Sequence, residues 1–308
     1  MTRFNANMFG VLGKLHRATR TWFVRPTINT ALFPATGTHG PGFVADSSPL
    51  CRTADLESEM FQKWRAVLAE PACSNRKLWE WCFIPAVLEA KGLLREGVQG
   101  LGFAVGREPL AALFASRGCR VTATDLATDD PRAQAWKDTG QHAEHLVAAL
   151  NSRGICSEPL FRERVSFRSV DMNDIPTDLL RAEYDFTWST CSFEHCGTLE
   201  LGLAFVRRQM ECLRPGGIAV HTTELNLSSN TTTIESGPTV IYRRRDIERL
   251  VGTLTADGHR VAPLDLSLGE HPLDKHVDRL PYDFDRHVRL ALYGYAVTSI
   301  GIVVTKRG

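Results

Sequence analysis

The sequence predicts an α/β fold with a mostly parallel sheet and helices on both of its faces. Two observations carry this prediction. From residue 97 onward, short apolar or β-branched runs alternate with segments whose apolar residues recur every three or four positions, and such alternation is typical of parallel sheets. The last run, Val297–Thr305, is β-branched and apolar throughout, as expected of a central strand.

A glycine turn stands at the start of this alternation. Residues 97–126 are typical of a strand, a turn, a helix and a second strand, with the strands expected over Gly97–Leu101 and Arg120–Thr124. Glycine lacks the Cβ that would block a sharp turn or the close approach of a ligand. Asp125 follows the second strand, where the hydroxyls of a ribose would need an acceptor. The glycines of the turn are Gly100, Gly102 and Gly106.

Polar residues also follow the later strands, which we expect over Arg164–Val170, Tyr184–Thr190 and Ile218–His221. Ligands of open parallel sheets bind outside the carboxyl ends of the strands. The sequence therefore predicts one site at that edge. Its expected members are Asp125, Asp171, Glu194, His195, His221 and Glu224.

The composition is that of an ordinary globular protein. The 308 residues are 43% hydrophobic and 23% charged, and the net charge of +1 gives no overall field that would recruit nucleic acid or an anionic membrane. The eight cysteines lack paired short spacings, and no secretory signal precedes them, so we expect reduced thiols and a cytoplasmic protein. No apolar run approaches the roughly 18 residues of a transmembrane helix.

Two regions are expected. Residues 1–75 are predicted to form a basic arm, a loop and a helical extension. The arm, with five basic residues and no acidic one before residue 46, could lie on a membrane surface, close over an anionic substrate, or pack on the domain or on a second subunit of a homodimer. The main domain is expected over residues 76–308, with insertions at about 129–163, 226–242 and 267–290.

Apolar periodicity and stop signals predict the helices. A buried face recurs between Leu199 and Leu213, and the run Arg214-Pro-Gly-Gly217 is expected to end that helix. A strand over His259–Ser267 is expected after the last helix. The other helices are expected within residues 53–70 and over Arg76–Lys91, Ala133–Asn151 and Arg243–Ala256.

From about residue 76 the order of elements resembles the class I S-adenosylmethionine-dependent methyltransferases. The resemblance implies a Rossmann-like, seven-stranded, mostly parallel sheet with an antiparallel last strand, and S-adenosyl-L-methionine as cofactor. It also implies a ribose acid at Asp125 and an adenine-side acid at Asp171. It is carried by the turn Gly100–Gly106, Asp125, Asp171-Met172, Phe193-Glu194-His195, Leu213-Arg-Pro-Gly-Gly217 and the final pair of strands.

The chain departs from this family's pattern in the turn. Members usually carry an acid at the position of Gly100 and a glycine at that of Ala104. The missing acid would normally help to hold the methionine amino group, and Glu108 is a nearby substitute. With this substitution, the expected cofactor-binding residues are Gly100, Gly102, Gly106, Glu108, Asp125, Leu126, Asp171, Met172 and Ser189.

Methyl transfer to a hydroxyl needs alignment of donor and acceptor, exclusion of water and removal of a proton. Histidine suits proton removal because its pKa is near neutral, and a nearby carboxylate can orient it. The expected catalytic residues are His195, His221 and Glu224. The expected substrate-binding residues are Glu194 and, for a phosphate on the acceptor, Arg243 and Arg244. Two histidines and two carboxylates could instead bind a divalent metal, but their spacing lacks a carboxylate-rich pattern, and no metal is predicted.

The sequence thus predicts methyl transfer to a small polar acceptor, with the hydroxyl of a sugar or glycoconjugate as the first hypothesis. A nicotinamide-dependent oxidoreductase and a catalytically inactive, methyltransferase-like partner protein remain as alternatives. Methylation of nucleic acid is disfavoured. The expected Asn/Asp-Pro-Pro-aromatic run is replaced after the fourth strand by Ser189-Thr-Cys-Ser-Phe193.

Overall fold

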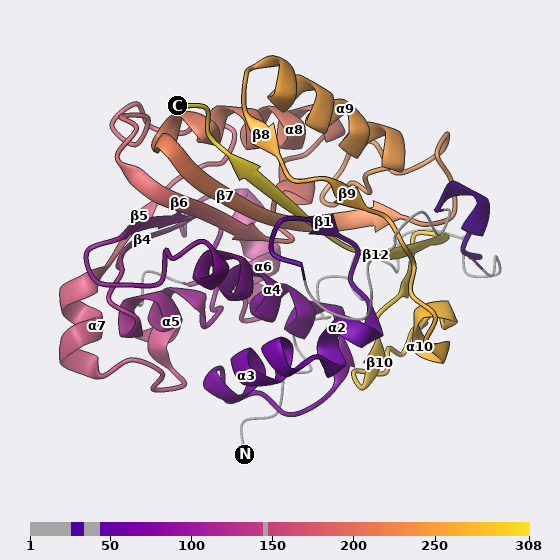
Figure 1. Cartoon of the computed structure of the whole chain (residues 1–308), viewed down its shortest axis with the longest axis horizontal. Helices are drawn as coiled ribbons and strands as arrows, with labels where there is room; N and C mark the ends of the chain where they lie inside the picture. The colour runs from indigo at the N-terminus through magenta and orange to yellow at the C-terminus, as the bar shows by residue number, and fades with distance from the viewer. Residues whose placement is uncertain (1–25, 34–43, 144–146) are drawn as a thin grey trace.

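The computed structural model describes residues 26–33, 44–143 and 147–308, so most of the predicted basic arm lies outside the described residues. Eight of the strands form one sheet, with the order β11-β12-β7-β6-β3-β4-β5 and with β8 also paired to β12 (Figure 1). Their bounds are β3 (Gln99–Gly102), β4 (Arg120–Asp125), β5 (Val165–Ser169), β6 (Tyr184–Thr190), β7 (Leu213–Asn226), β8 (Arg260–Val261), β11 (Leu290–Leu292) and β12 (Tyr295–Thr305).

The strand directions confirm the predicted fold class. Strands β5, β4, β3, β6 and β7 are parallel, whereas the long strand β12 runs antiparallel to β7 over nine paired residues. The two short strands β8 and β11 both pair antiparallel with β12. The sheet is therefore the Rossmann-like sheet with an antiparallel last strand, extended by one short strand beyond the seven expected.

Helices cover both faces of the sheet (Figure 1). One layer holds α2 (Thr53–Glu57), α3 (Glu59–Val67), α4 (Arg76–Ala90), α5 (Leu110–Ser116) and α7 (Glu158–Arg164), and the other holds α8 (Leu199–Arg208) and α9 (Arg244–Ala256). The short elements are β1 (Ser48–Pro49), β2 (Ser74–Asn75), α6 (Gln134–Asp138), β9 (Leu264–Asp265), α10 (Pro272–Lys275), β10 (Arg286–His287) and the 3-10 turns η3 (Thr30–Leu32), η4 (Pro131–Ala133), η5 (Val147–Asn151), η6 (Phe193–His195) and η7 (Gln209–Cys212).

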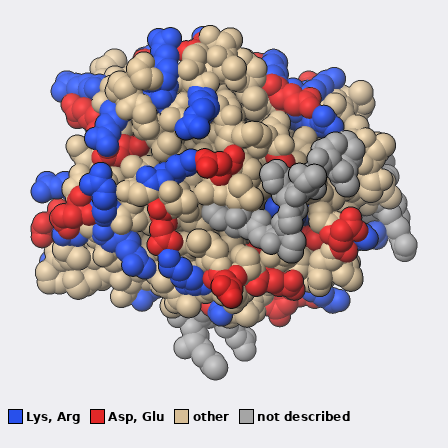
Figure 2. Space-filling model, viewed as in Figure 1, with Lys and Arg blue, Asp and Glu red and all other residues tan. Residues whose placement is uncertain are grey.

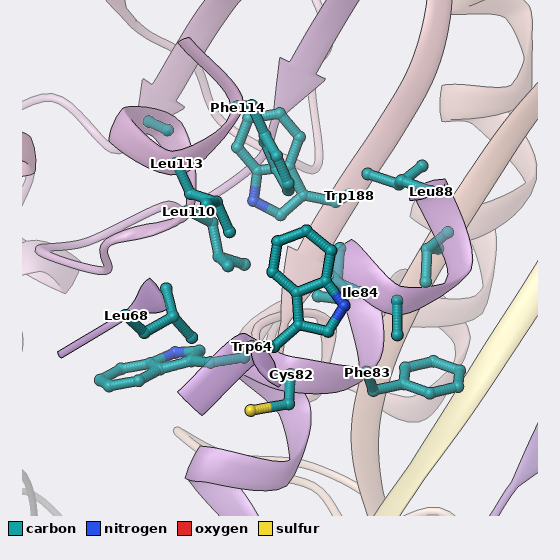
Figure 3. Packing of buried hydrophobic residues seen from close by; sticks show 14 of the residues in the cluster. Trp64, Leu68, Cys82, Phe83, Ile84, Leu88, Leu110, Leu113, Phe114 and Trp188 are labelled. Carbon is teal, nitrogen blue, oxygen red and sulfur yellow. The ribbon is translucent and has the colours of Figure 1, made fainter. Parts of the chain in front are cut away.

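An aromatic core lies between the sheet and the α4/α5 layer (Figure 3). The ring of Phe114 packs edge-on against Phe186 and Trp188, with ring centroids 5.3 Å and 5.0 Å apart. A Cβ at Gly100 would overlap the ring of Phe186, and one at Gly102 would overlap Trp188. These two glycines therefore make room for the core. Their predicted role in cofactor binding stays a prediction.

Three predicted elements differ from the observed ones. The expected helix Ala133–Asn151 is interrupted, because a turn at Gly140, with φ +67°, follows α6, and residues 147–151 form the 3-10 turn η5. The expected strand His259–Ser267 is split into β8 and β9 around Pro263, which has no N–H to donate to a ladder. The run Arg214–Gly217 lies inside β7, so the helical segment before it has already ended at Cys212.

The surface carries both signs of charge. On the face shown in Figure 2, basic and acidic side chains are interspersed, in line with the net charge of +1. Among the described residues, no helix is long and apolar enough to span a membrane.

Candidate functional site

The glycine turn and Asp125 lie side by side at the carboxyl ends of β3 and β4. The Asp125 carboxylate accepts hydrogen bonds from the backbone N–H groups of Gly106 (3.1 Å) and Leu126 (2.8 Å). Gly106 has φ +53°, and a Cβ there would lie 2.8 Å from the carbonyl oxygen of Gln141, so both conformation and space require glycine. The structure thus brings the turn and the predicted ribose acid into direct contact.

Asp171 and Met172 follow the next strand, β5, beside the end of β4. The backbone N–H of Val170 donates to the carbonyl oxygen of Asp125 (2.7 Å), which joins the two strand ends. The Asp171 carboxylate pairs with Arg132 (2.7 Å) and accepts from the N–H of Asn173 (2.9 Å), while Met172 is buried. The predicted adenine-side pair therefore adjoins Asp125, with Arg132 as a partner that the sequence did not indicate.

The segment of residues 130–143, part of the predicted first insertion, lies across this edge of the sheet. Besides the Arg132–Asp171 pair, His142 Nε2 lies 3.0 Å from the carbonyl oxygen of Leu126. The ring of Trp136 packs edge-on against that of His195, with centroids 4.5 Å apart. One segment therefore contacts both the nucleoside end of the candidate site and the residues after β6.

Glu108 lies where it could replace the acid that the turn lacks. Its carboxylate accepts a hydrogen bond from Thr190, and Lys77 Nζ lies 3.6 Å from its other oxygen. Burial raises the pKa of Glu108 to about 7, although the nearby Lys77 opposes this shift. Glu108 joins the ends of β3 and β6 to the first turn of α4.

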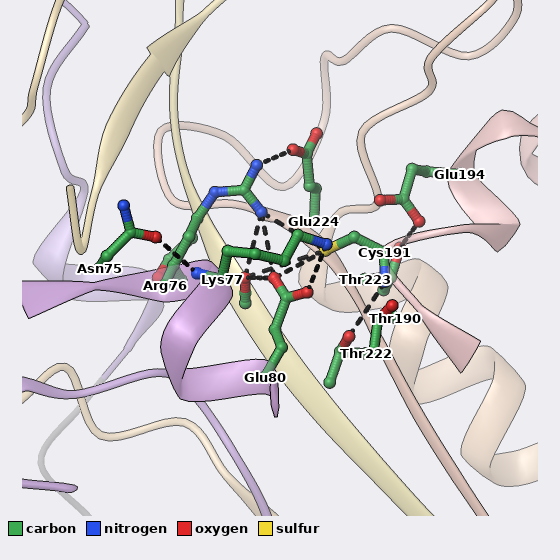
Figure 4. Close-up of polar contacts among 12 residues, drawn as sticks. Asn75, Arg76, Lys77, Glu80, Thr190, Cys191, Glu194, Thr222, Thr223 and Glu224 are labelled. Carbon is green, nitrogen blue, oxygen red and sulfur yellow. Dashed lines mark hydrogen bonds and ion pairs between the residues drawn. The ribbon is translucent and has the colours of Figure 1, made fainter. Parts of the chain in front are cut away.

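The first turn of α4 supplies charged residues that sequence reasoning missed. Arg76 Nη2 lies 2.6 Å from Glu224 Oε1, and Lys77 Nζ lies 2.8 Å from Glu80 Oε2 (Figure 4). Burial alone would raise the pKa of Glu80, but Lys77 and Arg76 outweigh burial and hold this pKa below its usual value. The sequence did contain a signal for these residues: Arg76, Lys77 and Glu80 place three charges within five residues at the start of an otherwise apolar helix.

Cys191 lies at the centre of this charged group, directly after β6. Its thiol is 3.0 Å from Glu80 Oε1 and 3.4 Å from Arg76 Nη1. Its φ of +41° is left-handed, which is rare for a residue other than glycine, and its N–H is held by Thr222. Burial raises the pKa of the Cys191 thiol well above its ordinary value, so this thiol is protonated at neutral pH.

Glu194 and His195 continue from Cys191 in η6. Glu194 is fully buried, with Oε2 accepting from the Thr223 hydroxyl (2.9 Å), and burial raises its pKa to about 7. His195 Nδ1 lies 2.8 Å from the carbonyl oxygen of Pro238, which can only accept, so Nδ1 carries the proton. Burial lowers the pKa of His195, and the ring is neutral with a lone pair on Nε2, 4.0 Å from Glu194 Oε1.

His221 and Ser189 do not join this group. His221 is fully buried near the rings of Phe193 and Phe205, with Nδ1 2.8 Å from the Ser189 hydroxyl. Burial lowers its pKa to about 3. Ser189 is also fully buried, so the pair belongs to the core below the edge. The predictions of His221 as a general base and of Ser189 as a cofactor ligand therefore lack support.

Arg243 and Arg244 lie apart from the site as well. Arg243 is buried in ion pairs with Asp246 and Glu235, both at 2.7 Å. Arg244 pairs with Glu248 (2.7 Å) and donates to the carbonyl oxygen of Leu32. Both guanidinium groups are engaged within the chain, and the predicted phosphate site on these arginines stays a prediction without a contact that supports it. Across the described residues, no group of three or more His, Cys, Asp or Glu is arranged to hold a metal ion.

Comparison with known proteins yields structural likeness only. No protein-family model and no curated protein matches the sequence. Magnesium protoporphyrin IX methyltransferase from Synechocystis PCC 6803 is similar over 81% of this chain and 92% of its own, with 13% identity and a TM-score of 0.42. The 1,6-didemethyltoxoflavin N1-methyltransferase of Burkholderia thailandensis is similar over 72% of this chain and 76% of its own, with 16% identity and a TM-score of 0.39.

A Galdieria sulphuraria protein, provisionally assigned as a sarcosine dimethylglycine methyltransferase, is similar over 48% of this chain with 18% identity and a TM-score of 0.33. The match covers only 45% of that protein. Because all three identities are below 25% and all three TM-scores are below 0.5, the fold assignment rests on the strand order of this chain.

Proposed function

We propose that this chain is an S-adenosyl-L-methionine-dependent methyltransferase that acts on a small polar acceptor. A Rossmann-like sheet hosts many functions, so the fold alone does not carry the proposal. The observation that carries it is the contact between Asp125 and the Gly106 turn at the ends of β3 and β4. This contact sets a buried carboxylate beside a left-handed glycine, at the edge where open parallel sheets bind their ligands.

The residues at this edge fit the chemistry of the cofactor. Asp125 would accept from the ribose hydroxyls, with Leu126 beside it, and Asp171 with Met172 would take the adenine side. Glu108 would hold the amino group of the methionine end. When bound, the cofactor supplies an electrophilic methyl group on a sulfonium.

His195 is the residue best suited to take a proton from the acceptor. Its bond to Pro238 fixes the tautomer and leaves Nε2 as an acceptor, and its lowered pKa keeps the ring neutral at physiological pH. Glu194, 4.0 Å away, would stabilise the charge that develops on the ring. The finer proposal is O-methylation of a hydroxyl on a sugar or glycoconjugate, because a hydroxyl is the acceptor that needs such a base.

Calorimetry with S-adenosylhomocysteine and, separately, with NAD tests the proposal. We expect micromolar binding of S-adenosylhomocysteine and none of NAD. Asp125→Asn should weaken the binding of S-adenosylhomocysteine by at least tenfold, because a hydrogen bond to a charged group is worth about 1.5–3 kcal/mol.

Asp129→Ala is the matched control, because Asp129 is exposed four residues further along the same loop. Thermal unfolding of each variant reports whether the turn has kept its structure. NAD binding, or unchanged S-adenosylhomocysteine affinity in a folded Asp125→Asn variant, would contradict the proposal.

A further inference from the structure

Two carboxylate oxygens at the site are buried without a hydrogen-bond partner among the described residues. They are Glu224 Oε2 and Glu194 Oε1, and the two residues are 3% and 0% exposed. Buried polar atoms in proteins are nearly always paired, because an unpaired one costs about 1–3 kcal/mol. Two such oxygens at the carboxyl edge of the sheet indicate a ligand that donates hydrogen bonds to them.

The two glutamates are close neighbours. Val240 N–H donates to the carbonyl oxygen of Glu194 (2.9 Å), and Tyr242 N–H donates to that of Glu224 (3.1 Å), so one short segment holds both backbones. Thr223, which precedes Glu224, binds the other oxygen of Glu194. In Figure 4 the unpaired oxygen of Glu194 points away from Thr223, towards the side on which Glu224 lies.

A second polar atom accompanies each of these oxygens. Beside Glu224 it is Arg76 Nε, which also lacks a partner in the described part of the chain and belongs to the guanidinium bound to Glu224 Oε1. Glu224 Oε2 needs a donor and Arg76 Nε needs an acceptor. The hydroxyls of one polyhydroxylated compound can take both roles, whereas an ammonium cannot accept and a phosphate dianion or carboxylate cannot donate.

Beside Glu194 the second atom is His195 Nε2, an acceptor 4.0 Å from Glu194 Oε1. A second hydroxyl suits this place, because it can donate its one proton to either acceptor. Charge supports the same choice. Both cations of this group, Arg76 and Lys77, are already engaged by Glu224, Glu80 and Glu108, so neither is left to pair with an anionic group.

We infer that Glu224 with Arg76, and Glu194 with His195, bind two neighbouring hydroxyls of an uncharged polyhydroxylated acceptor and reject phosphorylated ones. Glu224 and Arg76 are the specificity-determining residues, and His195 faces the hydroxyl that reacts. The inference rests on the proposed function, because it assigns the acceptor side of the same site.

Saturation-transfer NMR on the full chain with S-adenosylhomocysteine tests this inference. The probes are the methyl glycosides of glucose, mannose and galactose, the phosphates of glucose and mannose, and the amino sugars glucosamine and galactosamine. We expect saturation of the neutral glycosides and at least tenfold weaker binding of the phosphates and amino sugars. Equal or tighter binding of a phosphate or amino sugar, or no binding of any neutral glycoside, would overturn the inference.

Glu224→Gln replaces the unpaired acceptor by a donor while retaining an oxygen for Arg76. It should weaken neutral glycoside binding about ten- to hundredfold. Glu200→Gln, on the exposed surface of α8, is the control and should leave binding unchanged. Unaltered glycoside affinity in a folded Glu224→Gln protein would count against the inference. If that variant fails to fold, the inference is decided by whether the unaltered protein binds neutral glycosides more tightly than sugar phosphates and amino sugars.

Calorimetry with S-adenosylhomocysteine in the same samples separates the two proposals. Glycoside binding without cofactor binding overturns only the proposed function. Cofactor binding without glycoside binding overturns only the inference on the acceptor.

Discussion

The histidine at position 221 shows how burial decides what a titratable residue can do. Its ring is fully buried, its Nδ1 is bound to Ser189, and its pKa is lowered to about 3 by burial. The ring of His195, in contrast, is held through Nδ1 by the carbonyl oxygen of Pro238, and its Nε2 lies near the Glu194 carboxylate. The two residues have the same chemistry in the sequence, and only their surroundings separate a core residue from a candidate base.

The pKa of His221 predicts a pH dependence of stability. Because the unfolded chain protonates this ring near pH 6.5 and the folded chain only near pH 3, protons favour the unfolded state between these values. The free energy of unfolding should fall as the pH decreases below about 6.5, by about 2 kcal/mol at pH 5 from this residue.

His221→Asn removes the titration and retains an acceptor for Ser189, so its stability should fall less steeply between pH 7 and pH 5. Denaturant unfolding at several pH values measures the two slopes. His276→Asn, at an exposed position, should keep the slope of the unaltered protein. Equal slopes for His221→Asn and the unaltered protein would contradict the assignment.

The sequence predicted single site residues unevenly, for physical reasons. Asp125 was predictable because a strand end and a glycine turn fix the position of its side chain within a few residues of chain. Arg76 and Lys77 could not be predicted as site residues. Their partners, Glu224 and Glu108, lie far away in the sequence, and only the packing of α4 on the sheet brings them together. The packing role of Gly100 was not predictable, because the ring that needs its space, Phe186, lies on another strand.

At the scale of elements, the start of α9 shows why consecutive arginines need not be a ligand site. A cation at a helix N-terminus opposes the helix dipole. Asp246 in the first turn offsets this, because its carboxylate accepts from the N–H (2.9 Å) and the Nε (2.7 Å) of Arg243. The apolar periodicity that predicts the helix does not reveal this ion pair. The pair forms because Arg243 is buried at the start of α9, and the sequence pattern does not show that burial.

Asp246→Ala should destabilise the protein by about 3 kcal/mol, because it removes the buried partner of a buried guanidinium. Arg243 would retain the carbonyl oxygen of Thr231 and one carboxylate, that of Glu235, whose side chain is largely exposed. Glu248→Ala removes an exposed pair two residues further along α9 and should cost about 0.5 kcal/mol or less. Denaturant unfolding compares the two. Similar losses would show that the Arg243 pair adds nothing beyond a surface contact.

Strands and helices with continuous patterns were predicted well, and insertions were not. Tyr184–Thr190 was predicted to the residue, and the buried positions of α8 follow the expected spacing. Residues 133–151 were misassigned as one helix, because their position depends in part on Leu126 and His195, which belong to other elements. Local periodicity carries no information about such contacts.

At the scale of the whole molecule, the segment before α4 is joined to the end of the chain. Strand β1 pairs with β9 and β2 pairs with β10, so both short N-terminal strands pair with elements after residue 263. Arg52 lies at this junction, 2.9 Å from Asp265 and 3.2 Å from Asp55. Asp55 in turn accepts from the indole N–H of Trp79 in α4 (2.9 Å). Residues 44–75 therefore share a buried polar network with the sheet domain.

This network predicts that residues 44–75 and 76–308 unfold together. Arg52→Ala removes the cation between two buried carboxylates and should lower the free energy of unfolding of the whole chain by about 3–5 kcal/mol. Scanning calorimetry should show one transition, shifted to lower temperature as a unit. Asp46→Asn, which removes an exposed partner of Lys91, should leave that transition nearly unchanged. A second, separate transition in Arg52→Ala would mean that the N-terminal segment folds independently, and that the site at the start of α4 does not depend on it.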